Sequence, residues 1–177
     1  MKIVHIITSL DDGGAEHTLY KICKYDKYNK HVVISLKGTG KYFYLLNKIG
    51  VKVYCLNLKF YAIYQFLSFI TLLKFLKPDV VQTWMYHADF FGGLAAKIVG
   101  IKNIFWNIRN SNLDKKTKFS TKLVLKINAI LSNFIPNKII SCSKNSIKIH
   151  HALGYKNKFI YIGNGIKKKI INTIIIA

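Results

Sequence analysis

The stretch PDVVQTWMYHADFFGGLAAKIVGIKNIFWNIRNS, residues 78–111, decides the fold. Residues 80–83 form a short run rich in β-branched side chains, and residues 89–99 carry apolar side chains at helical spacing. Residues 104–108 then form a second short strand. The pattern predicts a strand, a loop, a helix and a second strand, so both strands end at the same edge of a parallel sheet.

Polar and aromatic side chains gather where these two predicted strands end. Trp84, His87 and Asp89 follow the first strand, and Asn107, Arg109 and Asn110 follow the second. Open α/β sheets bind their ligands at the carboxyl edge of the strands, so we expect a site here.

Each of these side chains also has a structural interpretation. We expect Trp84 and Trp106 to pack in the core or at its rim instead of contacting a substrate, because aromatic side chains at strand ends usually fill space. We expect Asp89 to be the N-cap of the following helix. For His87 a ligand contact and a structural role are equally consistent with the sequence. In the first case Asp89, two residues later, would orient its ring. Arg109 is the most telling residue, because it is the only arginine among 28 basic residues and its planar guanidinium suits phosphate or carboxylate.

The composition limits the number of domains and the classes of binding partner. A chain of 177 residues, 51% of them hydrophobic, has room for one well-packed domain. The net charge of +21 is typical of proteins that bind nucleic acid or an anionic membrane. Abundant Lys, Asn, Ile and Tyr with almost no Arg indicate an A- and T-rich coding sequence, and the lysines are not interleaved with a stacking platform, so we expect no nucleic-acid partner.

Cysteine usage and hydropathy indicate a cytoplasmic protein. Cys23, Cys55 and Cys142 are far apart and show no ligand spacing, which predicts reduced core residues with neither a disulfide nor a zinc site. The first residues lack the architecture of an export signal. Residues 60–73, the longest uncharged segment, fall short of the roughly 20 residues that span a bilayer.

The first predicted strand, residues 3–8 with His5 as a core residue, is followed by Gly13 and Gly14. Two glycines before a helix let a diphosphate approach the helix N-terminus, although a tight turn is the alternative. Glu16 either contacts a substrate or favours the helix N-terminus electrostatically. The GxGxxG fingerprint is absent, and residues 37–41 do not form a phosphate loop.

The remaining chain alternates regularly between strand and helix. Further strands are expected at residues 31–36, 51–56, 138–141 and 159–161, and further helices at residues 40–48, 62–77 and 114–134. We therefore predict an α/β fold, a single Rossmann-like doubly wound parallel sheet of about seven strands with helices on both faces. The last of these helices carries Lys115, Lys116, Lys118, Lys122 and Lys126, which form either a solvated face or a contact with an anionic membrane or phosphorylated lipid.

Four segments within residues 2–166 together resemble a known family. These are residues 13–16 after the opening strand, residues 78–89 with 92–97, residues 106–111, and residues 164–166. The chain resembles the N-terminal half of bacterial GT-B glycosyltransferases of the family 4 type, which build lipopolysaccharide, capsule or glycan chains on lipid carriers.

The resemblance implies a division of labour between two domains. In such enzymes the N-terminal domain receives a glycan or lipid-linked acceptor, and a second domain holds the nucleotide-sugar donor. Transfer retains the anomeric configuration, usually without a metal, so no cofactor is expected. The implied catalytic residues are His87 and Arg109, the latter near a position where many relatives carry histidine, and the implied substrate-binding residues are Gly13, Gly14, Glu16, Trp84, Asp89, Asn107 and Asn110.

The chain also departs from that family. Relatives continue past residue 166 into a donor domain with paired glutamates, and Gly163 stands where they usually have proline. Residues 167–177 form a basic, isoleucine-rich tail that looks non-native. We therefore expect residues 1–166 to be an acceptor-side domain that is inactive alone and needs a separate donor domain. The alternative is a non-catalytic module on the cytoplasmic face of the inner membrane.

Overall fold

A computed structural model describes residues 1–58, 63–110, 118–156 and 158–163 of the chain. The strands are β1 (Lys2–Ile7), β2 (Lys30–Ser35), β3 (Lys52–Cys55), β4 (Val80–Trp84), β5 (Ile104–Ile108), β6 (Lys138–Ser141) and β7 (Phe159–Tyr161). The helices are α1 (Gly14–Tyr25), α2 (Lys41–Lys48), α3 (Ile63–Leu76), α4 (Tyr86–Val99), α5 (Phe119–Leu131) and α6 (Lys144–Ala152).

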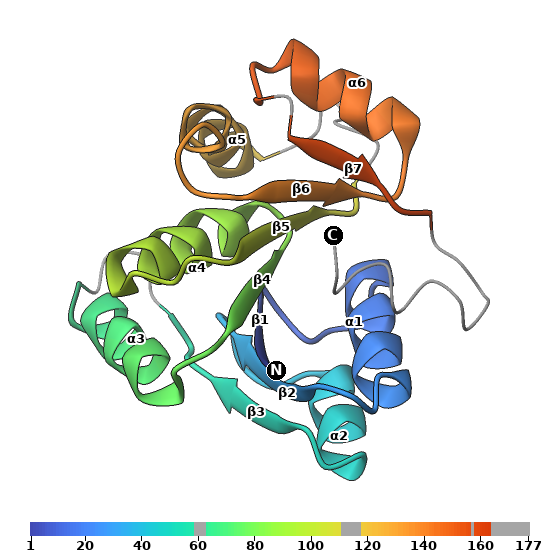
Figure 1. Cartoon of the computed structure of the whole chain (residues 1–177), viewed down its shortest axis with the longest axis vertical. Helices are drawn as coiled ribbons and strands as arrows, with labels where there is room; N and C mark the ends of the chain where they lie inside the picture. Colours follow the sequence, from blue (N-terminus) through green and yellow to red (C-terminus); the bar gives the residue numbers. More distant parts are fainter. Residues whose placement is uncertain (59–62, 111–117, 157, 164–177) are drawn as a thin grey trace.

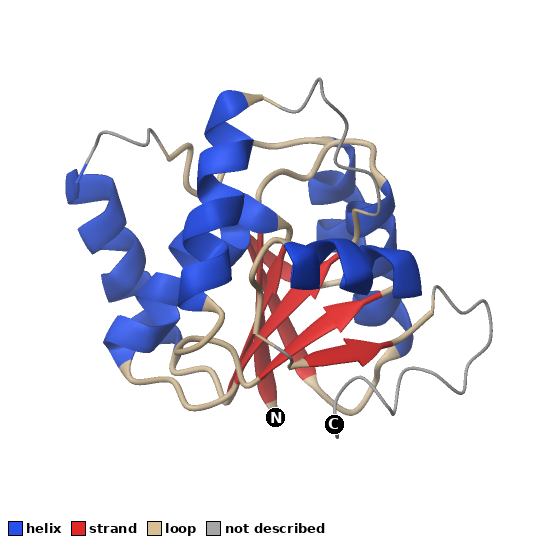
Figure 2. Ribbon diagram, turned by 90° about the horizontal axis from the view of Figure 1, so that it is seen from above, coloured by secondary structure: helices blue, strands red, loops and turns tan. Residues whose placement is uncertain are grey.

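The strands form one parallel sheet of 7 strands in the order β3-β2-β1-β4-β5-β6-β7 (Figure 1). Helices α3, α4 and α5 pack on one face of the sheet, and α1 and α2 pack on the other. The helices therefore flank the twisted sheet on both sides, as Figure 2 shows. The predicted doubly wound α/β fold is confirmed.

The core explains why these segments become strands. Residues of β1 and β2 are buried almost without interruption, as expected for parallel strands covered on both faces. His5 is fully buried inside β1, and Trp84 and Trp106 are fully buried as well. The core interpretation of these three side chains is confirmed.

Helix α4 lies close against the sheet because two consecutive glycines face it. A Cβ atom added to Gly92 would come within 2.8 Å of Ile6 Cγ2, and one added to Gly93 within 2.8 Å of Trp106 Nε1. This close approach sets the distance between the middle of α4 and the sheet.

Two expectations about local structure were wrong. Helix α4 begins at Tyr86, directly after β4, and its N-cap is Met85, so Asp89 lies in the first turn instead of capping it. Cys23 is buried, but Cys55 and Cys142 are only half-buried, since each stands at or beyond the end of a strand. All three cysteines are free.

Some expectations lie outside the described residues. These are the segment 164–166, the tail 167–177, and Lys115 and Lys116 of the basic helix. Within the described part of the chain, no helix combines the length and apolar character that a bilayer span requires.

Candidate functional site

The candidate site lies where the winding of the sheet changes direction. Strands β1 and β4 are neighbours, but the chain leaves β1 toward β2 and leaves β4 toward β5. The loops after two such strands diverge, which creates the crevice in which doubly wound proteins bind ligands. Gly13 and Gly14 follow β1 at this crevice, and His87 follows β4.

The two glycines have different surroundings. Gly13 is the N-cap of α1 with an extended backbone, and a Cβ atom there would collide with the carboxylate of Glu16. Gly14 opens the helix, and a Cβ atom there would meet nothing within 4 Å. The first turn of α1 is therefore open at Gly14, and its free N–H groups are suited to an anion.

Acidic side chains surround the same helix end. Burial raises the pKa of Glu16, and the nearby charges of Asp11 and Asp12 raise it further. Asp12 is paired with Lys41 at 2.7 Å in an exposed ion pair. Negative charge here opposes a bound diphosphate, so additional positive charge is required.

Lys37 supplies positive charge close to His87. His87 is the second residue of α4 and is half-buried. Burial lowers its pKa, and the charge of Lys37 lowers it further. The lowered pKa favours the neutral imidazole, in which one ring nitrogen can accept a hydrogen bond from a hydroxyl group. In the sequence, Lys37 stood out only as part of residues 37–41, which do not form a phosphate loop.

The turn that carries His87 is strained. Met85 has φ 71° and ψ 162°, a region that is essentially reserved for glycine. The strained turn lets α4 start immediately after β4, so that His87 lies close to the carboxyl end of β4. Backbone strain of this kind collects at functional sites.

Arg109 lies on the other side of the same edge, one residue after β5. Its guanidinium stacks 5.5 Å from the centre of the Trp84 ring, and its Nε donates to Asn107 Oδ1 at 2.9 Å. Burial lowers the pKa of Arg109, while the neighbouring Cys142 thiol acts in the opposite direction. The guanidinium remains charged, because arginine does not lose its proton in proteins.

Three of the predicted substrate-binding residues lie beneath this surface. Trp84, Asp89 and Asn107 are each 0% exposed. Trp84 supports Arg109 from below, and Asn107 orients it. In this structure these side chains can shape the site through the residues above them, but they do not present a surface to a ligand.

Asp89 does not orient His87. Residues two apart on a helix point in different directions, and Asp89 Oδ1 instead accepts the hydroxyl of Thr83 at 2.6 Å. Complete burial raises the pKa of Asp89 well above its usual value.

A hydrogen-bond network links α6 to the ends of β5 and β4. The sequence did not predict this network. The Ser146 hydroxyl donates to the backbone carbonyl of Asn110 at 2.8 Å, and His150 Nδ1 donates to the Ser146 carbonyl at 2.7 Å. The Tyr86 hydroxyl then donates to His150 Nε2 at 3.0 Å. The network ties the start of α4 to the end of β5. Ser143 is the N-cap of α6, and its side chain accepts a hydrogen bond from the Ser146 backbone N–H.

No known protein family and no curated protein matches this sequence. Solved structures do match the fold. The crystal structure of Anabaena Alr3699/HepE in complex with UDP aligns with a TM-score of 0.79 and 19% identity, over 94% of this chain and 45% of that chain. The chain has a Rossmann-like fold of the GT-B type.

Two further structures show that this fold serves different reactions. The lipopolysaccharide outer core galactosyltransferase WaaB aligns with a TM-score of 0.65 and 16% identity, over 95% of this chain and 47% of that chain. The UDP-N-acetylglucosamine 2-epimerase from Rickettsia bellii aligns with a TM-score of 0.64 and 17% identity, over 99% of this chain and 47% of that chain. The chain thus spans less than half the length of these proteins.

Proposed function

We propose that this chain is the acceptor-side half of a GT-B glycosyltransferase. The sugar would come from a nucleotide-sugar bound by a separate donor domain, and the acceptor would be a glycan, most simply one carried on a lipid. Bacterial cell-surface polysaccharide synthesis is the process that such an enzyme of the family 4 type would serve.

One observation carries the proposal. Gly14, His87 and Arg109 come from three different parts of the chain and follow the carboxyl ends of the neighbouring strands β1, β4 and β5. They offer an open helix N-terminus, a histidine with a lowered pKa and a half-buried arginine. This combination suits a charged donor and a hydroxyl acceptor in the same cleft.

The proposed roles follow from the surroundings of each group. Gly13 and Gly14 would face the donor diphosphate, with Lys37 adding positive charge. His87 would accept the hydrogen bond of the acceptor hydroxyl, and Arg109, stacked on Trp84, would bind phosphate or a sugar carboxylate. We propose transfer with retention of configuration and without a metal at this edge, on the strength of the family 4 resemblance alone.

Arg109 provides the first test. In a two-domain enzyme made by joining this chain to a donor domain, we expect Arg109→Lys to abolish sugar transfer, because lysine has neither the planar fork nor the stack on Trp84. The unfolding transition should not change. Lys138→Arg, an exposed basic exchange at the opposite edge, is the matched control and should transfer normally. Normal turnover by Arg109→Lys would show that this residue is only structural.

A second candidate function rests on α5. Phe119, Leu123 and Ile130 are 81%, 49% and 65% exposed, and Lys122 and Lys126 lie among them. Exposed apolar and basic side chains on one helix favour a peripheral contact with an anionic membrane. As a non-catalytic module, the chain would bind anionic vesicles without any sugar substrate and would stay inactive after a donor domain is added. An enzyme at the cytoplasmic membrane face would show both activities.

A further inference from the structure

A cluster of metal-ligating side chains lies inside the domain, away from the candidate site. His5 of β1, Cys23 of α1 and His31 of β2 are 0%, 6% and 7% exposed. One ligand atom from each residue lies within 4.8 Å of the other two. From these positions we propose a zinc site formed by His5, Cys23 and His31.

The donor set and its surroundings fit that ion. Zinc accepts both thiolate and imidazole ligands, and a tetrahedral ion held by these three side chains would leave a fourth position for water. A cavity of about 400 Å³ is lined by Cys23 and His31, which provides both the fourth position and an entry path. The spacing of these residues in the sequence does not match a metal-binding motif, because they come from three different elements.

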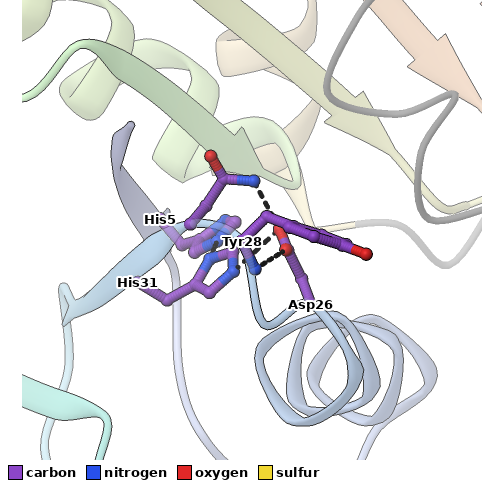
Figure 3. A network of polar contacts seen from close by, with 5 residues as sticks. His5, Asp26, Tyr28 and His31 are labelled. Atoms are coloured by element: carbon purple, nitrogen blue, oxygen red, sulfur yellow. Dashed lines mark hydrogen bonds and ion pairs between the residues drawn. The ribbon is translucent and has the colours of Figure 1, made fainter.

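The ring of His31 is already oriented as a metal ligand requires. Asp26 Oδ2 lies 3.1 Å from His31 Nε2 and also accepts from the Asn29 side chain, and Asp26 Oδ1 accepts from the Tyr28 backbone N–H. Figure 3 shows His5, His31, Asp26 and Tyr28 in this arrangement. A carboxylate on one nitrogen keeps that nitrogen protonated and directs the other toward the metal. His31 Nδ1 points toward His5 Nε2, 2.9 Å away.

Metal binding has to rearrange one proton. The Trp84 indole N–H donates to His5 Nδ1 at 3.3 Å, so the His5 proton lies on Nε2 in the metal-free protein. On binding, this proton moves to Nδ1, so the Trp84 indole N–H loses its acceptor and has to turn away from His5. The Cys23 thiol loses its proton to solvent, and His5 Nε2 and His31 Nδ1 move apart to the spacing of two ligands on one tetrahedral ion. Gln82, which lies within hydrogen-bonding reach of His5, offers an acceptor for the relocated proton. No oxidant or reductant takes part.

Cobalt(II) is the probe for this site, because a thiolate ligand gives Co²⁺ a charge-transfer band in the near ultraviolet. Lys2, Lys27, Lys30 and Lys52 also line the cavity and slow the entry of a cation, so chelator-treated protein is equilibrated overnight with Co²⁺. We expect one Co²⁺ per chain, quenching of Trp84 fluorescence that persists in Trp106→Phe, and displacement by Zn²⁺ with a rise in Tm.

Three variants separate this site from adventitious binding. Cys23→Ala should lose the band, whereas Cys55→Ala, which removes a half-buried cysteine on β3, should retain it. Asp26→Asn should weaken Zn²⁺ binding by about 10- to 100-fold while leaving the band in place at high cobalt. Folding of each variant is checked by circular dichroism. Absence of the band in folded wild-type protein, or its persistence in Cys23→Ala, would overturn the proposal.

Discussion

The backbone of Met85 is the most specific residue-scale feature of the candidate site. Its φ of 71° and ψ of 162° are strained for any residue with a Cβ atom. We expect Met85→Gly to be more stable than Met85→Ala by about 1–3 kcal/mol, because both lose the same side-chain packing and only glycine relieves the strain. Urea unfolding of the two variants measures the difference. Equal stability would mean that this turn carries no strain.

Asp89 gives a pH dependence with a defined sign. Its folded-state pKa is raised well above 3.8 by burial, so the folded protein holds a proton that the unfolded chain releases. Stability is therefore lost as pH rises from the unfolded pKa toward the folded one. In Asp89→Asn this loss should disappear, and the variant should gain stability relative to wild type as pH rises above about 4. Unfolding curves with the same pH slope for both proteins would contradict this assignment.

At the scale of elements, the contact between α4 and the sheet depends on Gly92. A Cβ atom there would lie 2.8 Å from Ile6 Cγ2 and 3.1 Å from Thr83 Cγ2. Overpacking of this kind costs about 1–3 kcal/mol, more than the helix propensity that alanine adds. We expect Gly92→Ala to unfold at lower urea than Gly14→Ala, whose new Cβ atom meets nothing within 4 Å. The reverse order would mean that α4 can move away from the sheet without cost.

The elements themselves could be predicted closely from the sequence. Residues 104–108, 138–141 and 159–161 became strands with the expected bounds, because apolar runs between turn signals are local features. The predicted start of α4 was wrong by three residues, because the helix begins at residue 86 and not at residue 89. This start depends on the strained backbone conformation of Met85, which cannot be predicted from the residue type.

The candidate site was predictable only in part, for a physical reason. The switch-point edge follows from strand order, so His87 and Arg109 were placed correctly at that edge. Which side chains reach the surface depends on helix rotation and packing, so the burial of Asp89 and Asn107 could not be foreseen. The meeting of His5, Cys23 and His31 depends on the register between β1 and β2 and on the docking of α1.

At the scale of the whole molecule, the main feature is a large excess of positive over negative charge. The net charge is +21, because 28 lysine and arginine side chains stand against 7 aspartate and glutamate side chains. Mutual repulsion destabilises a compact state with this much charge of one sign, and salt screens it. We therefore expect the free energy of unfolding to rise with NaCl, with Tm increasing by roughly 2–4 °C for each 1 kcal/mol gained.

A charge-reduced variant tests whether repulsion is the cause. Lys21, Lys48 and Lys148 are exposed on three different helices, α1, α2 and α6, and can be replaced together by glutamine. If self-repulsion limits stability, this variant should be more stable than wild type at low salt and should respond less to NaCl. A salt response of equal size in both proteins would indicate a specific anion site instead, and the open N-terminus of α1 at Gly14 would then be the place to look for it.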